Sequence, residues 1–329
     1  MPTRVVCYGL GPIGLGIARL ALARPGIEVV GAIDVDPEKA GRDLGELLAA
    51  PASGVAISAD AVGTLAAARP DVVLHGTGSS LPRVAPQLRT IAEAGANIVS
   101  TSEELAYPWT AQPQLAAELD AAARRSGITM LGTGINPGYA MDALPLMLTA
   151  PCAAVRAVRV LRVVDAARRR GPLQRKVGAG LTPEQFEARV RDGSVRHVGL
   201  PQSLHMLATS LGWNLDRSDD SIAAVIADRP IVTDYVRVEA GQVAGVRQIA
   251  RGFLNEREVL SLELRMYLGA PDPQDTVEID GDPPVRLSVA GGLHGDIATA
   301  AIAVNAVPSV VRAAPGLASM SDLPLVHFW

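Results

Sequence analysis

The chain has 329 residues, of which 48% are hydrophobic and 19% are charged, and this balance predicts two globular domains. Its formal net charge of -4 offers no basic surface to nucleic acid or an anionic membrane, and no apolar stretch approaches the roughly 18 residues of a membrane span. Cys7 and Cys152 form neither a disulfide framework nor a metal-ligand spacing, so we expect a soluble cytoplasmic protein that binds no metal.

A glycine-rich turn, GLGPIG, follows the first apolar run of the chain and precedes helix-forming residues. The first glycine permits a tight turn, the second lets the backbone approach a pyrophosphate, and the third lets the helix pack on the strand. The helix N-terminus offers free N–H groups and its positive dipole end to phosphates. A plain strand-to-helix turn is the alternative. The expected dinucleotide site comprises Gly9, Gly11, Pro12, Ile13 and Gly14.

An acid ends the second expected strand. Asp34 stands 20 residues past the last glycine of the turn, where a carboxylate bonds the ribose hydroxyls of adenosine and repels a 2′-phosphate. Arg42, eight residues further on, could instead reach that phosphate. We therefore expect that NAD is accepted, with NADP also possible.

Short β-branched runs alternate with alanine-rich helical segments from Arg4 to about Met130. This alternation indicates a parallel, doubly wound α/β sheet of the Rossmann type, in which ligands bind beyond the carboxyl ends of the strands. Helices are expected at 17–23, 82–94 and 113–125. The expected strands are residues 5–8, 29–34, 55–58, 72–75, 97–100 and 128–131.

Longer runs that alternate apolar with polar residues follow Met141, which is typical of antiparallel strands with one wet face. A loop-rich insert at 166–229 carries two short helical patterns, 183–191 and 203–211, and a final helix is expected at 296–314. Because the strands would present a broad face, a homodimer is expected. The expected strands here are residues 153–165, 231–240, 243–255, 258–268 and 285–289.

These patterns predict two domains. The first is a Rossmann domain, residues 1–140, completed by the C-terminal segment 296–329. The second is an α+β domain with a mainly antiparallel sheet, residues 141–295, for substrate binding and dimerisation.

Two adjacent acids follow the fifth expected strand, at the ligand edge of the sheet, within the run STSEELAYPW. We expect one of Glu103 and Glu104 to point to water and the other to face the ligand crevice with Tyr107 and Trp109. A carboxylate partly removed from water can exchange protons near neutrality. Alternatively, a serine or threonine of the same run caps a short helix whose first turn holds the acids, which requires no chemistry.

Small residues follow two further strands. Gly76, Thr77 and Gly78 come after the fourth, and their size would let the nicotinamide end of a cofactor lie close to the backbone. The run GTGINPGY follows the sixth strand and demands a special backbone where the two domains would meet. We place Asn136 with the cofactor and Tyr139 with the substrate; the alternative is a hinge loop without ligand contact.

Cations and imidazoles offer further candidates. Lys176 lies in the run LQRKVGAG, a loop that could hold an anionic substrate group or simply be solvated. His197 and His205 lack the acid or cysteine partners of a zinc site, and we assign Lys176, His197 and Trp109 to the substrate. The ring of His75, at a strand end, is expected to pack inside.

Taken together, these segments resemble the 2,4-diaminopentanoate dehydrogenase family, which includes native amine dehydrogenases. The motifs span nearly the whole chain, and their combination is far more specific than any one of them. They are GLGPIG (9–14), STSEELAYPW (100–109), GTGINPGYAMD (132–142), LQRKVGAGLTPEQF (173–186), RHVGLPQS (196–203) and HGDIATAAIAVNAVP (294–308).

The resemblance implies an architecture similar to that of dihydrodipicolinate reductase, a Rossmann domain plus an antiparallel α+β domain that also forms the dimer. In the family, the second acid of the SEEL motif is the key catalytic carboxylate, and it corresponds to Glu104. The chain lacks the lysine-rich Lys-x-Asp-x-Pro-Ser-Gly-Thr loop typical of dihydrodipicolinate reductases and has Lys176 amid glycines instead. That departure argues against a lysine-biosynthesis enzyme.

The expected activity is that of an NAD(P)-dependent amine dehydrogenase, which interconverts a primary amine with a small carbonyl compound and ammonia. One alternative is a true 2,4-diaminopentanoate dehydrogenase, in which Lys176 or a neighbouring arginine holds the substrate carboxylate. A different class of protein, a non-catalytic dinucleotide-binding sensor, shares the fold but turns nothing over.

Overall fold

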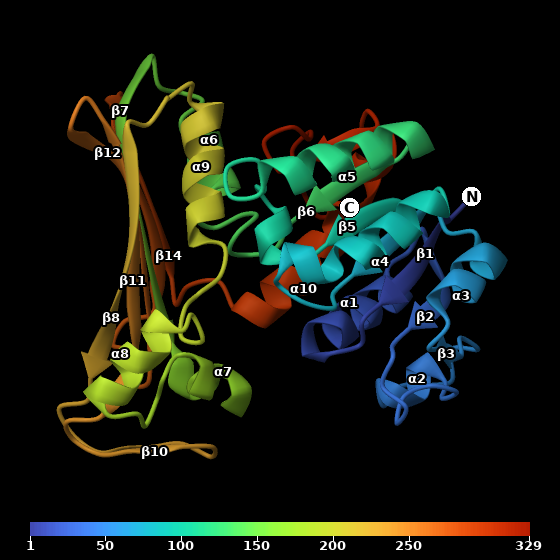
Figure 1. The fold of residues 1–329 in the computed structure, drawn as a ribbon, viewed down its shortest axis with the longest axis horizontal. Coiled ribbons are helices and arrows are strands. Elements are labelled where there is room, and N and C mark those ends of the chain that lie inside the picture. Colours follow the sequence, from blue (N-terminus) through green and yellow to red (C-terminus); the bar gives the residue numbers. More distant parts are fainter. The chain divides into compact units, whose positions relative to one another are not determined.

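The structure, a computed structural model, describes all residues 1–329 and falls into two compact units (Figure 1). The first unit contains Met1–Tyr139 and His294–Trp329, and the second contains Ala140–Leu293. The chain therefore leaves the first unit after residue 139 and returns at residue 294 to complete it. None of its helices combines the length and the apolar character needed to cross a membrane.

A seven-stranded parallel sheet forms the centre of the first unit, in the order β15-β6-β5-β4-β1-β2-β3. The order reverses between β1 and β4, and in doubly wound sheets ligands bind at this switch point. Every strand expected in this part of the sequence is confirmed. The strands are β1 (Thr3–Tyr8), β2 (Ile27–Ile33), β3 (Ile57–Ser58), β4 (Val72–His75), β5 (Asn97–Ser100), β6 (Thr129–Gly132) and β15 (Gly316–Ala318).

Helices cover both faces of this sheet (Figure 1). Leu65, Leu88 and Leu119 of α3, α4 and α5 bury their side chains against the strands in one hydrophobic cluster. On the opposite face α1 packs against α10, and α11 packs against β5 and β6. The helical elements are α1 (Pro12–Ala23), α2 (Leu44–Leu47), α3 (Ala61–Ala68), α4 (Leu81–Glu93), the 3₁₀ turn η1 (Glu103–Leu105), α5 (Pro113–Ser126), α10 (Gly295–Asn305) and α11 (Val307–Arg312).

The C-terminal segment corrects the expectation of one helix at 296–314. It forms two helices, α10 and α11, and Pro308 lies in the first turn of α11, where its missing N–H is tolerated. The chain then adds β15, which pairs with β6 as an edge strand. A three-residue strand is too short to show hydrophobic periodicity, so it could not be predicted from the sequence.

The second unit is built on a six-stranded sheet in the order β14-β13-β7-β12-β11-β8. Its pairings are antiparallel except that β12 runs parallel to β7. The strands are β7 (Ala154–Asp165), β8 (Arg217–Ile226), β11 (Val243–Leu254), β12 (Arg257–Tyr267), β13 (Gln274–Asp282) and β14 (Val285–Ala290), and a separate hairpin holds β9 (Ile231–Val232) and β10 (Arg237–Val238).

Two strands of this sheet were not predicted, and one predicted strand does not belong to it. The strands β8 and β13 were missed: their acids break the alternating pattern, and in the structure Asp219 pairs with Arg251 and the buried Asp275 pairs with Arg162 at 2.6 Å. Residues 231–240 form no strand of the main sheet. Their middle is a turn in which the Thr233 hydroxyl accepts hydrogen bonds from the next backbone N–H groups.

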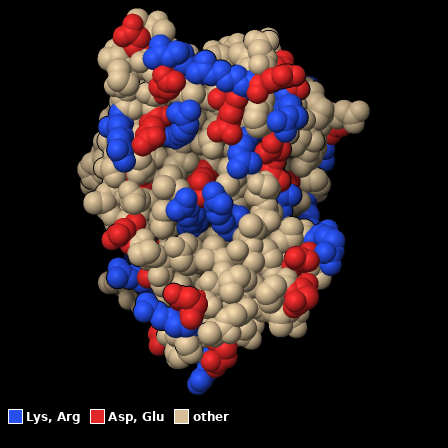
Figure 2. All heavy atoms as spheres, turned by 90° about the vertical axis from the view of Figure 1, so that its left-hand side faces the viewer, with Lys and Arg blue, Asp and Glu red and all other residues tan.

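One face of the second sheet is covered by helices, and the other carries none (Figure 1). Helix α9 packs on β11 and β12, α8 on β8, and α6 on α9 and β13. On the open face acids and bases are interleaved (Figure 2): Glu263 lies 2.6 Å from both Arg247 and Arg265, and Arg251 pairs with Glu258. The helical elements are α6 (Ala143–Leu148), the 3₁₀ turn η2 (Ala166–Arg168), α7 (Gly171–Lys176), α8 (Pro183–Arg191) and α9 (Leu200–Ser210).

Candidate functional site

The glycine loop between β1 and α1 has the shape of a phosphate cradle. Gly9 has a φ of +89°, which a side chain would strain, and a Cβ placed on Gly14 would lie 1.7 Å from the Gly9 carbonyl oxygen. A Cβ placed on Gly11, by contrast, meets nothing within 4 Å. The N-terminus of α1 has no side-chain cap and no acid in its first turn. Its N–H groups and the open space over Gly11 therefore fit the pyrophosphate of a dinucleotide.

Asp34 follows β2 and is tied to this loop. Its carboxylate accepts hydrogen bonds from the N–H groups of Leu10 at 2.6 Å and Asp36 at 2.9 Å. Burial by itself would raise the pKa of this carboxyl, but those two N–H groups and the ammonium of Lys39 hold it below its ordinary value. Asp34 is therefore a fixed, charged acceptor at the place where a ribose hydroxyl is expected.

The cation beside Asp34 is Lys39 and not Arg42. Lys39 Nζ lies 3.2 Å from Asp34 Oδ2 and 3.3 Å from Asp36 Oδ2, whereas Arg42 pairs with Glu46 at 3.1 Å on the surface. The sequence contained the signal in the run DVDPEK, but the turn that brings the lysine back onto the acids could not be foreseen. The assignment of Arg42 to the cofactor has no support in this arrangement.

The loop after β4 packs directly on the glycine loop. A Cβ on Gly9 would lie 2.7 Å from the Thr77 methyl group, and a Cβ on Gly76 would lie 3.8 Å from Gly14 and 3.5 Å from the Thr101 hydroxyl. The Thr77 hydroxyl donates to Gln87 Oε1 at 2.6 Å, so the proton of this hydroxyl already has an acceptor within the protein. The ends of β1, β4 and β5 thus form one continuous surface at the carboxyl edge of the sheet.

His75 is fully buried at the end of β4, which confirms that its ring packs inside. Its Nδ1 lies 2.8 Å from the Ser100 hydroxyl and its Nε2 lies 2.9 Å from Gln87 Oε1, while Tyr8 meets the ring edge-on at 5.5 Å. Burial lowers the pKa of His75 to about 4. The imidazole therefore stays neutral at physiological pH and serves the packing of the strand ends.

The low pKa of His75 makes the fold sensitive to acid. Since the unfolded chain binds the proton below about pH 6.5 and the folded protein only below about pH 4, stability is complete above pH 6.5 and falls as the pH drops through this window. The loss should reach about 3 kcal/mol by pH 4. Urea unfolding of the wild type and His75→Gln at pH 7 and pH 4 measures it; an equal pH dependence in both proteins contradicts the assignment.

Glu104 lies in η1, directly after β5, and its carboxylate is held by two donors. Oε2 accepts hydrogen bonds from the N–H of Leu81 at 2.7 Å and from Gln112 Nε2 at 3.0 Å. The acids do occupy a short helical turn, as the capping alternative predicted, but the Ser102 hydroxyl donates to the Ser79 carbonyl rather than capping that turn. Glu104 instead caps the neighbouring helix α4.

The turn that carries Glu104 lies against the end of β6. A Cβ on Gly132 would come within 2.4 to 2.6 Å of the main chain at Leu105 and Ala106, so only glycine allows this contact. Tyr107 and Trp109 follow, with their rings edge-to-face at 5.0 Å. Trp109 packs partly against the hydrophobic core of the first unit.

The loop after β6 contains the other first-unit candidates. The N–H of Ile135 donates to the Thr299 hydroxyl of α10 at 3.2 Å, which links this loop to the returning C-terminal segment. Asn136 is buried and is followed by a cis peptide bond to Pro137, and Tyr139 is the last residue before the chain leaves the first unit. The first-unit candidates other than Arg42 therefore occupy the glycine loop or strand ends at one edge of one sheet, and their roles remain predictions.

Lys176 was expected in a glycine-rich loop, but it lies at the end of a helix. Residues 171–176 form α7, with a proline in its first turn, and Lys176 is exposed at its last position. The glycines that follow are explained by packing: Gly178 has a φ of +83°, and a Cβ there would lie 2.8 Å from the Phe186 ring. The substrate role of Lys176 stays a prediction.

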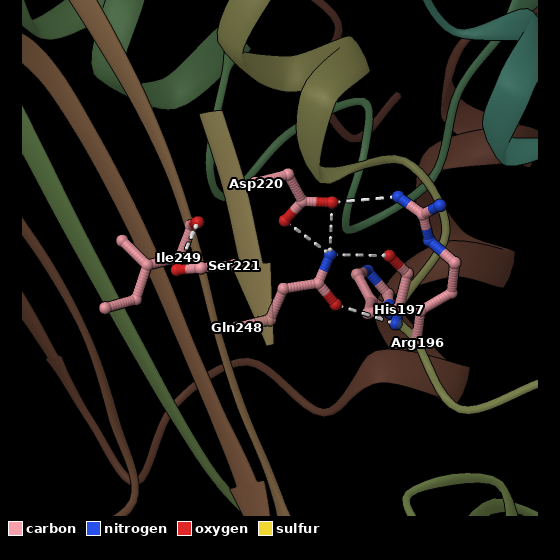
Figure 3. Close-up of polar contacts among 6 residues, drawn as sticks. All are labelled: Arg196, His197, Asp220, Ser221, Gln248 and Ile249. Carbon is pink, nitrogen blue, oxygen red and sulfur yellow. Dashed lines mark hydrogen bonds and ion pairs between the residues drawn. The ribbon is translucent and has the colours of Figure 1, made fainter. Parts of the chain in front are cut away.

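His197 lies between α8 and α9 in the second unit, where a buried amide fixes its main chain (Figure 3). Gln248 Oε1 accepts from the His197 N–H at 2.9 Å, and Gln248 Nε2 donates to Asp220 Oδ1 at 2.9 Å. Arg196 completes the network with an ion pair to Asp220 at 2.8 Å. His197 was expected from the sequence, whereas Gln248 was not, because a glutamine within a strand carries no signal of a functional site.

A parallel sheet with a glycine cradle at its switch point, joined to a second α+β unit, defines a Rossmann-type protein of two units. Among solved structures, the amine dehydrogenase from Mycobacterium smegmatis is similar over 100% of this chain and 98% of its own, with 29% identity and a TM-score of 0.89. Dihydrodipicolinate reductase from Paenisporosarcina, 12% identical with a TM-score of 0.50, shares the fold. The expected fold class is confirmed.

Sequence comparison identifies the family. Residues 139–329 match the 2,4-diaminopentanoate dehydrogenase C-terminal domain. The 2,4-diaminopentanoate dehydrogenase of Acetoanaerobium sticklandii is 31% identical over 98% of this chain and 93% of its own length, and the amine dehydrogenase of Streptomyces virginiae is 26% identical over 97% and 96%. The chain belongs to the 2,4-diaminopentanoate dehydrogenase family, as its motifs indicated, and is a dehydrogenase of that family.

Proposed function

We propose that this chain is an NAD(P)-dependent amine dehydrogenase, which aminates a small ketone or aldehyde with ammonia and runs the reverse deamination. The observation that carries the proposal is the place of Glu104. A carboxylate with one engaged oxygen stands at the same sheet edge as the phosphate cradle, two strand ends away. The names of two relatives, both amine dehydrogenases, support this substrate class.

The nicotinamide cofactor supplies the hydride. In the proposed assignment the N–H groups at the start of α1 bind its pyrophosphate over Gly11, and Asp34 accepts a ribose hydroxyl. Gly76 and Gly78 have no side chains, which would leave space over the loop after β4 for the nicotinamide end to approach Glu104. Asn136 is placed beside this end, because it lies in the loop after β6 at the same edge.

Glu104 would handle the nitrogen. An ammonium ion would pass one proton to the carboxylate and add to the carbonyl carbon as ammonia. One proton then moves from the new ammonium group to the alkoxide oxygen, which becomes a hydroxyl. The protonated Glu104 gives its proton to that hydroxyl, which leaves as water. Its negative charge then stabilises the iminium carbon–nitrogen bond that receives the hydride, and the product is a primary amine. Trp109 and Tyr139 are the residues of the first unit that are proposed to contact the carbonyl substrate. In the second unit the proposed residues are His197 and Lys176, which is exposed at the end of α7.

The second candidate is a dehydrogenase that acts on 2,4-diaminopentanoate itself, which the 31% identity to that enzyme of Acetoanaerobium sticklandii favours. The test compares 2-pentanone plus ammonium chloride with 2,4-diaminopentanoate, each followed by NAD(P)H absorbance. Turnover of 2-pentanone supports the amine dehydrogenase, and turnover of the amino acid alone supports the second candidate. Cofactor binding without turnover of either compound, or of other simple ketones and aldehydes, would leave the dinucleotide sensor.

Lys39 leads to a prediction about cofactor choice. Because its ammonium group neutralises Asp34, we expect both NADH and NADPH to bind, with Lys39 available to a 2′-phosphate. Lys39→Met should weaken NADPH about tenfold, the effect of one charge-assisted hydrogen bond, and NADH much less. Arg42→Met is the matched control and should change neither. Fluorescence titration measures all four affinities; an equal loss for both cofactors, or a larger effect of Arg42→Met, contradicts the prediction.

We also propose a homodimer formed through the open face of the second sheet. The face is broad and bears no helix, and its interleaved acids and bases are suited to contact with a second copy of themselves. Light scattering at micromolar concentration should therefore give twice the chain mass of 34.2 kDa. A single-chain mass at that concentration rules the dimer out.

A further inference from the structure

The two oxygens of the Glu104 carboxylate have different surroundings. Oε2 accepts both hydrogen bonds, one from the Leu81 N–H and one from Gln112 Nε2, and Oε1 accepts none from the protein. The side chain is half-buried, so it is neither fully solvated nor sealed in the core. One oxygen is held in place and the other is left for a ligand.

The first donor is the N-terminus of a long helix. Leu81 is the first residue of α4, and the residue before it, Ser80, provides no side-chain cap; the first turn of the helix contains no acid. The carboxylate therefore meets the positive end of the dipole of a 13-residue helix. The main chains are also joined, since the Glu104 N–H and the Ser102 hydroxyl both donate to the Ser79 carbonyl oxygen.

The second donor comes from a different helix start. Gln112 immediately precedes α5, and its main chain is fixed by bonds to the Pro108 carbonyl oxygen and from the Ala116 N–H. Gln112 is half-buried as a residue, so water can reach it, and a free amide there would carry a smaller penalty than one in the core. The bond from Gln112 Nε2 is needed to keep the Glu104 carboxylate in one orientation.

We propose that Gln112, together with the N-terminus of α4, is a positioning residue that holds Oε2 of Glu104 so that Oε1 is the atom that meets the reacting nitrogen. This inference rests on the proposed function. A carboxylate gripped by two donors on one oxygen cannot exchange its oxygens by rotation without breaking both bonds. The proton therefore leaves and returns at one atom in a fixed place, which is what oriented proton transfer requires.

The test replaces Gln112 by methionine, which keeps the length of the side chain but removes the donor. Gln114→Met is the matched control, because Gln114 is an exposed glutamine in the first turn of the same helix. With 2-pentanone and ammonium chloride, Gln112→Met should lower kcat about tenfold and leave the KM for 2-pentanone and the affinity for NAD(P)H within about twofold. Gln114→Met should behave as the wild type. A kcat within twofold of wild type for Gln112→Met overturns the inference.

A double-mutant cycle separates this failure from failure of the proposed function. If Gln112 acts through Glu104, Gln112→Met should have little further effect on the residual rate of Glu104→Gln. A tenfold loss in both backgrounds means that Gln112 acts independently, which overturns the inference. Full activity of Glu104→Gln removes Glu104 from the chemistry and overturns the proposed mechanism and the inference together.

A measurement without cofactor or substrate keeps the inference testable if 2-pentanone is not turned over. Urea unfolding of the same four proteins gives the coupling between positions 112 and 104 in the free protein. The bond predicts that Gln112→Met destabilises the wild type more than it destabilises Glu104→Gln, where the acceptor is uncharged. Additive effects on stability contradict the positioning contact regardless of activity.

Discussion

Glu104→Gln is expected to lower the rate of amination by about two or more orders of magnitude, the usual contribution of a general acid–base group. Glutamine keeps the shape of the side chain, and its carbonyl oxygen can still accept from the Leu81 N–H, so the cap of α4 survives. What it loses is the base and the negative charge. Steady-state rates with ammonium and a carbonyl substrate measure the loss, and NAD(P)H titration should show unchanged cofactor affinity.

Glu103→Gln is the matched control, an adjacent acid in the same short turn. Its effect should be mild, because its carboxylate makes no hydrogen bond or ion pair within the protein and the turn itself is retained. Near-normal turnover for Glu104→Gln with a severe loss for Glu103→Gln would mean that the other acid carries the chemistry. Normal turnover for both would leave Glu104 with its capping role alone, and His197 would be the next residue to test.

Gly11→Val is expected to weaken NAD(P)H binding by about two orders of magnitude, roughly 2.7 kcal/mol. The valine would fill the space in which the pyrophosphate approaches the backbone. Since a Cβ at Gly11 meets no protein atom within 4 Å and its φ of -70° suits any residue, the fold should be unaffected. Fluorescence titration measures the affinity, and the thermal midpoint should stay within about 1 °C of wild type.

Gly14→Ala provides the contrast within the same motif. Its Cβ would lie 1.7 Å from the Gly9 carbonyl oxygen, so the loop backbone must move and the protein should lose stability as well as affinity. The two substitutions are thus predicted to act in different ways: Gly11→Val blocks the ligand, whereas Gly14→Ala distorts the fold. Wild-type affinity in Gly11→Val would show that the cofactor phosphates lie elsewhere.

Structural elements that depend on residues close together in the sequence could be predicted. The strands of the first unit other than β15, the glycine cradle and Asp34 at the end of β2 all depend on residues within one strand–turn–helix segment, and hydrophobic periodicity predicts such segments directly. Strands whose polar residues are neutralised by partners far away in the sequence could not be predicted. The acids of β8 and β13 are typical of loops in the sequence, and only the structure shows that Arg251 and Arg162 form ion pairs with them.

The candidate site divides in the same way. The sequence by itself determined the residue types at the sheet edge, because the glycines and the SEEL acids lie in short motifs next to predicted strands. Only the tertiary structure decided that Lys39, not Arg42, neutralises Asp34, and that one oxygen of Glu104 is held by α4 and Gln112. Such contacts join residues whose distance in space is set by turns and by neighbouring strands, and no spacing along the chain encodes that distance.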